Sequence, residues 1–574
     1  MPSAVAVDDL ATAELNFACA HAVLRTLKSA GMNHVVLCPG SRNTPLILAA
    51  DSLWGSSAYV VVDERAAGFF ALGIAKSSGL PVALICTSGS AGAHVLPAMI
   101  EASHSAIPLI VVSADRPGNL QHCDAPQTTH QGEIFSTHVR RRFHIEASQS
   151  TYRRASSITT QLLTACIGPD RGPGHLNIGF AEPLWKQGVS VPEALTDVRP
   201  VFPKITGIDL PMDILGMIAR AKRPIIVMGP SVDPLWADAA LSVVELARAW
   251  RCPVIADPLS QLRSPAFELG YQLIAAGDTI LRSTTRFRAL DPDLVIRCGL
   301  PPTSKAIGKW MASLEANTIL VDPAGRLRDP SHRLSHILVG SMADFARAAS
   351  KHARHAERGW LERWQNEEML SQGRATAVRM GLWEGPLWQT LLASMGSEMI
   401  LHVGSSMPVR DLDTFGIRIP CPVYGNRGVN GIDGGIATSC GEAVGGDVPM
   451  VAVIGDVAFA HDASALQLAA SLDVNMTLIL LDNGGGHIFD YLPVAAHRDK
   501  TLFQRAYITK PRVDWEFLCK AYGVRYLVCA DLDAFKHTID ECFERRGVDV
   551  VHIKIDPENS FSAHQELWHE VHND

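Results

Sequence analysis

Two polar residues that follow neighbouring strands could build a site for a metal ion and a phosphate group. In VAVIGDVAFAHDASALQLAASLDVNMTLILLDNGGGHIF, one predicted strand ends at Gly455-Asp456, and the next ends just before Asn483 and three glycines. Asp456 and Asn483 are 27 positions apart, the length of one strand–helix–strand unit, so both are expected at the same edge of a parallel sheet. Carboxylate, amide and carbonyl oxygens suit Mg²⁺, and glycines let a diphosphate approach the backbone.

Each half of this pattern also has an ordinary interpretation. Gly-Asp and Asn-Gly are common turn sequences, and either dipeptide alone would predict no more than a turn. Because both fall on one strand–helix–strand unit, their joint placement favours a binding site over two unrelated turns.

The rest of the chain must supply the sheets that position such a site. Short β-branched runs alternate with amphipathic stretches, which is typical of parallel sheets covered by helices. In the first third, the predicted strands are 34–38, 59–62, 82–87, 109–113 and the run GPGHLNIGFAEPLW, which we expect to close the domain. In the remainder they are 224–228, 253–256, 293–298, 318–321, 336–339, 398–403, 422–424, 450–454, 476–481 and 550–555.

These sets predict an α/β fold made of three doubly wound parallel-sheet domains. We expect the domains at residues 1–190, 208–350 and 383–574. Residues 186–211 are rich in Pro and Val and are predicted to be a linker, whereas 351–382 have the pattern of a helical connection. A further helix is predicted at Ala463–Ala470. Ligands of such sheets bind beyond the carboxyl ends of the strands, so the loops there are the candidates for function.

Composition narrows the class of protein. The 574 residues are 47% hydrophobic and 19% charged with a net charge of −8, which excludes a disordered chain. No basic stripe indicates a nucleic-acid partner, and no apolar run is long enough to form a transmembrane segment. Asp8 and Asp9 stand where a signal peptide would have basic residues, and the twelve cysteines lack metal-site or disulfide spacing. We therefore expect a cytoplasmic protein.

The Gly-Asp…Asn layout resembles the diphosphate-binding motif of thiamine-diphosphate (ThDP) enzymes. Two positions depart from that motif, since Val457 stands where Gly is commoner and Asp482 where Asn is usual. The resemblance implies that ThDP binds here together with Mg²⁺, or with Mn²⁺ in its place. The implied metal ligands are Asp456, Asn483 and the carbonyl of Gly485.

The resemblance also implies how the organic part of the cofactor is held. In NRGVNGIDGG, Ile432 matches the apolar wedge that bends the cofactor, and Gly431 and Gly434 leave backbone room for it. Gly455, before Asp456, is also implied to bind the cofactor. A ThDP enzyme further needs a carboxyl group on the aminopyrimidine ring, because hydrogen bonding there activates the cofactor. Glu64 in YVVVDERAAGFF follows a strand and precedes an apolar helix, as that role requires. Alternatively, Asp63 and Glu64 are an acidic pair favoured by the helix dipole.

Six loops resemble, more narrowly, those of the 2-succinyl-5-enolpyruvyl-6-hydroxy-3-cyclohexene-1-carboxylate (SEPHCHC) synthase family of menaquinone biosynthesis. They are CPGSRNTPLILAA, VDERAAG, SADRPGNL, GSSMPVRDLD, YGNRGVNGIDG and GGGHIFDYLP, and the resemblance runs from about residue 12 to 495. It implies a transferase that decarboxylates 2-oxoglutarate on ThDP and adds the succinyl group to isochorismate. It also implies a homodimer, or a dimer of dimers, in which Glu64 and Asp456 of different subunits form one site.

The same resemblance gives roles to individual residues. Those implied to be catalytic are Glu64, Ser41, Arg42 and Gln127. Those implied to bind substrate are Arg116, Lys305, Ser406, Arg410 and Arg427, with an apolar wall of Ile488, Phe489 and Leu492. Arginine suits this task because it binds carboxylates with two parallel hydrogen bonds. Three residues depart from the family pattern, namely Asn43, Pro126 and Ala306, and the last two bear on the identity of the acceptor.

Three alternatives stay open from the sequence. A ThDP decarboxylase or carboligase of the acetohydroxyacid-synthase type would share the cofactor residues but use another 2-oxo acid, which would leave the matched arginines without a purpose. A ThDP-fold protein could act as a non-catalytic binding module. A dinucleotide-binding dehydrogenase is disfavoured because CPGSRN, TSGSAG and MGPSVD do not supply G-x-G-x-x-G.

Overall fold

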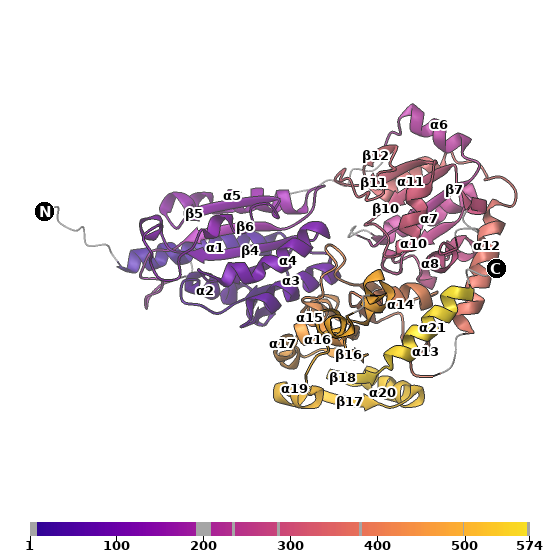
Figure 1. Cartoon of the computed structure of the whole chain (residues 1–574). Coiled ribbons are helices and arrows are strands. Elements are labelled where there is room, and N and C mark those ends of the chain that lie inside the picture. Colours follow the sequence, from indigo (N-terminus) through magenta and orange to yellow (C-terminus); the bar gives the residue numbers. More distant parts are fainter. Residues whose placement is uncertain are drawn as a thin grey trace. The chain divides into compact units, whose positions relative to one another are not determined.

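The structure, a computed structural model, describes residues 9–190, 208–231, 236–283, 288–377, 381–496 and 499–570 (Figure 1). These residues form three six-stranded sheets in which every strand pairing is parallel. One compact unit holds the first sheet with Ala437–Asp447 and Gln467–Ala469, and a second unit holds the other two sheets. The predicted α/β class with three parallel sheets is confirmed.

The first sheet has the strand order β2-β1-β3-β4-β6-β5. Its strands are β1 Val35–Leu37, β2 Ala58–Val60, β3 Val82–Cys86, β4 Leu109–Asp115, β5 Arg141–Glu146 and β6 Gly174–Gly179. Its helices are α1 Asp9–Ser29, α2 Thr44–Trp54, α3 Glu64–Ser78, α4 Ala91–His104 and α5 Gln149–Ile167. Helices α1, α2 and α5 share one buried apolar cluster with the strands, while α3 and α4 pack against each other outside it.

The second sheet has the order β12-β11-β10-β7-β8-β9. Its strands are β7 Pro224–Met228, β8 Val254–Ala256, β9 Leu273–Ile274, β10 Leu294–Cys298, β11 Asn317–Asp322 and β12 His336–Val339. Its helices are α6 Met212–Arg220, α7 Trp236–Trp250, α8 Gly277–Ile280, α10 Lys305–Ser313 and α11 Met342–Ser350. Read from the β9 edge, the order along the chain is third, second, first, fourth, fifth, sixth, which is that of dinucleotide-binding sheets.

The third sheet has the order β14-β13-β15-β16-β18-β17. Its strands are β13 Ile400–Val403, β14 Val423–Tyr424, β15 Met450–Gly455, β16 Asn475–Asp482, β17 Arg525–Cys529 and β18 Gly547–Lys554. The helices in this part of the chain are α13 Glu384–Ser394, α14 Met407–Phe415, α15 Gly435–Gly446, α16 Asp456–His461, α17 Ala465–Ser471, α18 Lys500–Phe503, α19 Trp515–Tyr522, α20 Leu532–Glu544 and α21 Pro557–Glu570. Most of α15 and part of α17 belong to the first compact unit. Its strand order repeats that of the first sheet, whereas the second sheet differs from both.

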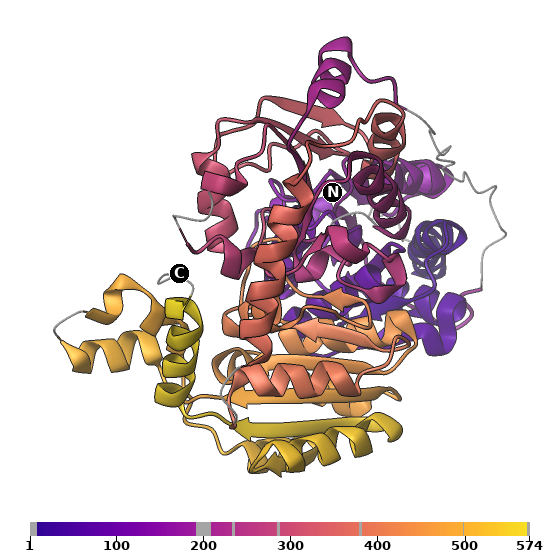
Figure 2. The ribbon, with the colours of Figure 1, turned by 90° about the vertical axis from the view of Figure 1, so that its right-hand side faces the viewer.

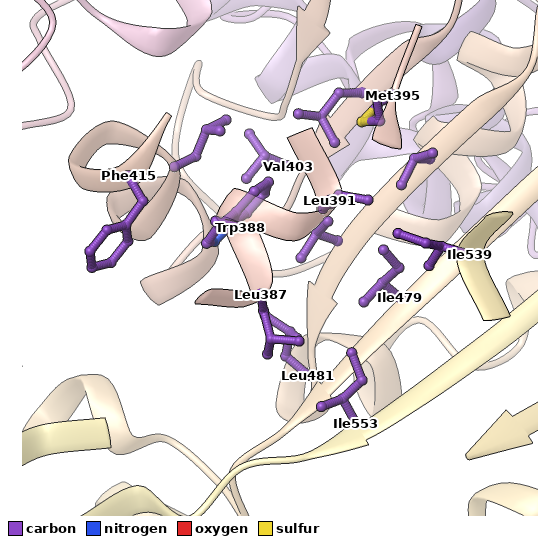
Figure 3. Close-up of a cluster of buried hydrophobic side chains, with 14 of the residues drawn as sticks. Leu387, Trp388, Leu391, Met395, Val403, Phe415, Ile479, Leu481, Ile539 and Ile553 are labelled. Atoms are coloured by element: carbon purple, nitrogen blue, oxygen red, sulfur yellow. The ribbon is translucent and has the colours of Figure 1, made fainter. Parts of the chain in front are cut away.

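Helices α13 and α14 are fixed to the third sheet by a buried apolar cluster. Trp388 and Leu391 of α13 lie over Ile479 and Leu481 of β16 in this cluster, and Phe415 of α14 belongs to it (Figure 3). Burying one such side chain contributes about 1.5–3 kcal/mol. The cluster therefore holds α14 firmly at the carboxyl end of β13.

A side-chain amide closes one edge of the third sheet. Gln261, in the loop after β8, donates from Nε2 to the carbonyl oxygen of Val423 (2.7 Å) and accepts from the Val423 amide at Oε1 (3.0 Å). Val423 lies in β14, the edge strand, so the Gln261 amide takes the place of a neighbouring strand.

All fifteen predicted strands correspond to observed ones, and three further strands were not predicted. The three are β5, β9 and β17, and each lies at the edge of its sheet. Because edge strands are less buried, β5 (RRFHIE) is polar and β9 has only two residues, so neither shows an apolar run. The GPGHLNIG run is confirmed as β6, the last strand of the first sheet along the chain, and within the sheet it lies between β4 and β5.

The predicted connections are described in part. The linker prediction at 186–211 falls largely on residues 191–207, which lie outside the described residues. The helical connection is confirmed as α12 (Trp360–Thr376), the long helix between the second and third sheets in Figure 2. The helix predicted at Ala463–Ala470 is observed as α17, displaced by two residues at its start. Within the described ranges, no helix has the length and apolar character that crossing a membrane requires.

Candidate active site

One cavity of about 360 Å³ lies where β13, β15 and β16 of the third sheet end. The strand order reverses between β13 and β15, the place where parallel sheets bind ligands. The predicted site residues that line the cavity are Ser406, Arg410, Arg427, Ile432, Gly455, Asp456, Asn483, Gly485, Ile488 and Phe489. Loops after four different strands thus bring together residues from across 84 positions of the chain.

Asp456, the first residue of α16, is buried in this cavity with one oxygen unused. Its Oδ1 accepts a hydrogen bond from the amide of Val457 (2.8 Å), while its Oδ2 has no hydrogen-bond partner among the described residues. Burial, together with the neighbouring carboxylate of Asp482, raises the pKa of Asp456 to about 7. A buried carboxylate oxygen without a donor is the arrangement that a bound cation would satisfy.

Asp482, the departure from the family pattern, is held by other protein groups. Its Oδ2 lies 3.0 Å from Nε2 of His552 and 3.2 Å from Nε1 of Trp515, and its Oδ1 accepts from the amide of Gly484 (3.0 Å). Burial alone would raise the pKa of Asp482, but the hydrogen bonds from His552 and from the Gly484 amide outweigh burial and lower it to about 2. Asp482 therefore anchors the glycine loop, and Asp456 keeps the free oxygen.

The three glycines after Asn483 are required by the protein itself. Gly484 and Gly485 have φ angles of +82° and +136°, which favour glycine. A Cβ atom on Gly485 would clash with the carbonyl oxygen of Ile508, and the amide of Gly486 donates to that same oxygen (2.6 Å). From the sequence, these glycines were expected only to make room for a diphosphate. The structure shows a second reason for glycine here, because the backbone of residues 507–508 passes close to the loop.

The loop after β13 presents Arg410 to the cavity. Ser406 precedes α14 with φ +75° and ψ −131°, a strained conformation for a residue with a side chain. Arg410, one turn later, donates from its guanidinium to the carbonyl oxygen of Ser406. Across the cavity, Ile432 is 36% exposed, an apolar side chain available for contact with a ligand ring.

In the first unit, Arg42 and Arg116 are buried and close to each other. Arg42 donates to the carbonyl oxygen of Phe180 (3.0 Å) and to Oε1 of Glu182 (2.7 Å). Arg116 donates to Oγ of Ser88 and to the carbonyl oxygen of Gln127, both at 2.8 Å. Burial, and then the charge of Arg42, lowers the pKa of Arg116.

A buried hydrogen-bond network that sequence reasoning missed supports Arg116. Oδ1 of Asp115 accepts from the amide of Arg116, and Oδ2 of Asp115 accepts from Nδ2 of Asn177, both at 2.8 Å. Gln131 donates to Oδ1 of Asn177 (2.8 Å) and accepts from the amide of Gly89 (3.0 Å). The available signal was the polar side chains of Asp115 and Asn177 within fully buried strands whose other residues are mostly apolar.

Glu64 begins α3 and is half-buried. The acidic-pair alternative holds for Asp63, whose Oδ1 accepts from the amides of Arg65 (2.9 Å) and Ala66 (3.3 Å). Glu64 does not make these capping bonds. Burial, and then the charge of Glu64, raises the pKa of the thiol of Cys86, the last residue of β3, to about 12.

The remaining predicted residues lie elsewhere. Ser41 is exposed, Gln127 has a positive φ of +55° beside Gly89, and Lys305 is exposed in the first turn of α10. Gly431, Lys305 and Leu492 do not line the cavity in the part of the chain that the structure describes. Of the departures, Asn43 is fully buried and donates to the carbonyl oxygen of Cys38 (2.8 Å), so it fixes the loop after β1.

No group of three or more His, Cys, Asp or Glu side chains that could hold a metal occurs within the described ranges. The set expected at Asp456 is of a different kind, because it combines a single carboxylate with an amide and a backbone carbonyl. Asp456 and Asn483, with the Gly485 backbone, line the same cavity, so the donor types fit a hard divalent cation.

Comparison with known proteins agrees with this geometry. Residues 17–139 match the family model described as the thiamine pyrophosphate enzyme N-terminal TPP binding domain, and residues 420–553 match the corresponding C-terminal TPP binding domain. A solved structure from Mycobacterium smegmatis, described as that of a thiamin diphosphate-dependent enzyme, covers 94% of this chain and 99% of its own at 17% identity with a TM-score of 0.71. This likeness shows the fold.

Curated relatives give a narrower result. The 2-succinyl-5-enolpyruvyl-6-hydroxy-3-cyclohexene-1-carboxylate synthase of Geobacillus kaustophilus (strain HTA426) is 34% identical over 573 residues, covering 96% of this chain and 97% of its own. The enzyme of the same name from Bacillus pumilus (strain SAFR-032) is 34% identical over 557 residues, covering 94% and 95%. Since the similarity extends through all three sheets, the chain belongs to the SEPHCHC synthase family of ThDP enzymes.

Proposed function

We propose that this protein is a SEPHCHC synthase, a transferase that decarboxylates 2-oxoglutarate on ThDP and adds the succinyl group to isochorismate in menaquinone biosynthesis. The observation that carries the proposal is the single cavity that combines the buried, unused oxygen of Asp456 with Ile432 and two arginines, Arg410 and Arg427. The full-length similarity to enzymes named for this reaction supports it.

The cofactor is proposed to bind along this cavity. Asp456, Asn483 and the carbonyl of Gly485 would hold Mg²⁺, or Mn²⁺, and the metal would hold the diphosphate. Ile432, exposed in the cavity wall, would support the rings from one side. When bound, ThDP supplies the nucleophilic carbon and the electron sink for decarboxylation. Ile488 and Phe489 would exclude water from that carbon.

Substrate recognition is proposed to depend on the arginines. 2-Oxoglutarate and isochorismate each carry two carboxylates, and guanidinium groups bind carboxylates through paired hydrogen bonds. In the second unit, Arg410 and Arg427 line the cavity. In the first unit, Arg42 and Arg116 donate hydrogen bonds to backbone carbonyl oxygens, which fixes their guanidinium groups. The proposed contacts of Lys305 and Leu492 with substrate rest on the family resemblance.

Self-association is part of the proposal. Glu64 belongs to one compact unit and Asp456 to the other, and the family resemblance places the two in one site through different subunits of a homodimer or a dimer of dimers. Glu64 would donate or accept the proton at the aminopyrimidine ring. We further propose domains at 1–190, 208–350 and 383–574, and a cytoplasmic location.

The decisive experiment is mass spectrometry of the product formed from 2-oxoglutarate and isochorismate with ThDP and Mg²⁺. We expect the SEPHCHC adduct, with CO₂ released. Release of CO₂ from pyruvate but not from 2-oxoglutarate would favour a carboligase of the acetohydroxyacid-synthase type instead. Unchanged cellular function of a Glu64→Gln variant would favour a non-catalytic binding protein.

A further inference from the structure

Helix α14 carries three charged side chains within four residues, and two of them, Arg410 and Asp411, line the cavity. Arg410 is exposed, whereas Asp411 and Asp413 are almost fully buried, at 1% and 4% exposure. Both acids have buried protein partners, Arg263 for Asp413 and His564 for Asp411, whereas Arg410 is the exposed member of the three. The partners of Asp411 and Asp413 therefore determine where Arg410 points.

Arg263, from the loop after β8, fixes the carboxyl-terminal end of α14. Its guanidinium forms a buried ion pair with Asp413 and donates to the carbonyl oxygens of Asp413 (2.8 Å) and Gly416 (3.0 Å). Its Nε donates to the carbonyl oxygen of Ala256 (2.8 Å). Arg263 thus satisfies the terminal carbonyl groups of the helix, which holds the end of α14 in place.

His564 of the C-terminal helix α21 fixes the middle of α14. Its Nε2 lies 3.0 Å from Oδ1 of Asp411, and both side chains are 1% exposed. Its Nδ1 lies 2.8 Å from the carbonyl oxygen of Ser560, whose hydroxyl donates to Oε2 of Glu384 (2.6 Å). Because both ring nitrogens face acceptors, both must carry hydrogen, and His564 is a cation. The hydrogen bond to Asp411 outweighs burial, which opposes the charge, and raises the pKa of His564 to about 9.

We propose that His564 is a positioning residue which, through Asp411, sets the rotation of α14 and so aims Arg410 at the substrate carboxylate. This rests on the proposed function, in which Arg410 binds 2-oxoglutarate. Asp411 has a second cation within electrostatic range, Arg410 itself. Without His564, the buried carboxylate of Asp411 would attract the guanidinium of Arg410 away from the substrate carboxylate, because a buried charge that loses its partner is strongly destabilising.

The test is His564→Gln in the full-length protein, with KM and kcat for 2-oxoglutarate measured beside the dissociation constant of ThDP with Mg²⁺. We expect KM to rise about tenfold, kcat to change less than threefold, and the ThDP constant to stay within twofold, because an arginine that binds the substrate carboxylate equally before and during reaction affects KM alone. An unchanged KM, or a parallel rise in the ThDP constant, would overturn the proposal.

Asp329→Asn is the matched control. It breaks the ion pair of Asp329 with Arg297 in the second sheet, which is equally buried (1% and 3% exposure, 2.8 Å). We expect this variant to lose thermal stability with no change in KM. If it raised KM as much as His564→Gln does, loss of any buried ion pair would explain the effect and the proposal would fail.

Hydrogen exchange provides a readout that does not depend on the substrate. We expect amides of residues 407–415 to exchange faster in His564→Gln but not in Asp329→Asn, and unchanged exchange would overturn the proposal. If the wild type does not turn over 2-oxoglutarate, the proposed function fails while this measurement still decides the inference. Should His564→Gln not fold, Asp411→Asn replaces it, since His564 can lose its proton once its partner is neutral, which leaves no buried charge. Faster exchange at 407–415 supports the proposal there, and unchanged exchange overturns it.

Discussion

The first and third sheets share one strand order, yet the charged groups at their carboxyl ends are in opposite states. In the first sheet the cations Arg42 and Arg116 already have protein acceptors. In the third, the buried carboxylates of Asp456 and Asp411 each keep an oxygen without a hydrogen-bond partner in the described ranges. The same topology thus carries one region in which protein acceptors bind the arginines, and another in which two buried carboxylate oxygens have no donor among the described residues. The fold supplies the position, and the loop residues determine whether a ligand is needed to complete it.

The largest expected effect comes from removing the buried carboxylate charge of Asp456. Asp456→Asn should weaken binding of ThDP with Mg²⁺ by about 100-fold or more, since the metal would lose the carboxylate ligand proposed for it. The same change should not lower the melting temperature of the ligand-free protein, because it relieves an uncompensated buried carboxylate. Isothermal titration and calorimetry measure the two quantities. Asp473→Asn, at an exposed acid, is the control, and a marked loss of ligand-free stability in Asp456→Asn would show that its role is structural instead.

In the first sheet, we expect a substitution to lower the stability of the protein without any dependence on ligand. Asn177→Leu should destabilise the protein by roughly 3 kcal/mol whether or not ligand is present. The buried side chains of Asp115 and Gln131 would each lose the hydrogen bond that they make with Asn177. Urea unfolding, followed by exchange of β4 and β6 amides, measures this loss. Recovery of wild-type stability on adding ThDP and Mg²⁺ would contradict the view that this region is complete without a ligand.

Adding and then removing ThDP with Mg²⁺ also tests the difference between the first and third sheets. ThDP with Mg²⁺ at 100 times the dissociation constant should stabilise the folded state by about 2.7 kcal/mol, and a chelator should reverse the effect. We expect slower hydrogen exchange chiefly in the loops after β15 and β16, with little change in β4 and β6. Equal protection of the two regions would remove the distinction between them.

The smallest expected effect concerns pH. The pKa of His564 is raised to about 9 in the folded protein from 6.5. Its contribution to stability is therefore complete below about pH 6.5 and is lost as the pH rises through 9. The stability difference between wild type and His564→Gln should shrink over this range, as measured by denaturant unfolding from pH 6 to 10. A difference that stays constant would mean that His564 is not a cation in the fold.

The sequence was sufficient to predict the site residues that lie in the loop directly after a strand. Asp456, Asn483 and Arg410 are of this kind, and the cavity brings them together. It did not reveal partners that come from distant segments. Ile508 limits the glycine loop and His564 pairs with Asp411, yet no spacing connects either to the site. Such contacts arise only when helices and loops pack, whereas strand ends are fixed by periodicity that a sequence displays directly.

The contact of Gln261 with β14 has a consequence for how the chain meets other chains. An unpaired edge strand offers its backbone groups to any extended segment, and sheets can grow from molecule to molecule in this way. Here the outward amide and carbonyl of Val423 are already occupied by one side chain. Sheet-to-sheet polymerisation is thereby blocked at this edge by a single amide, and Gln261→Leu would reopen it as a point of aggregation.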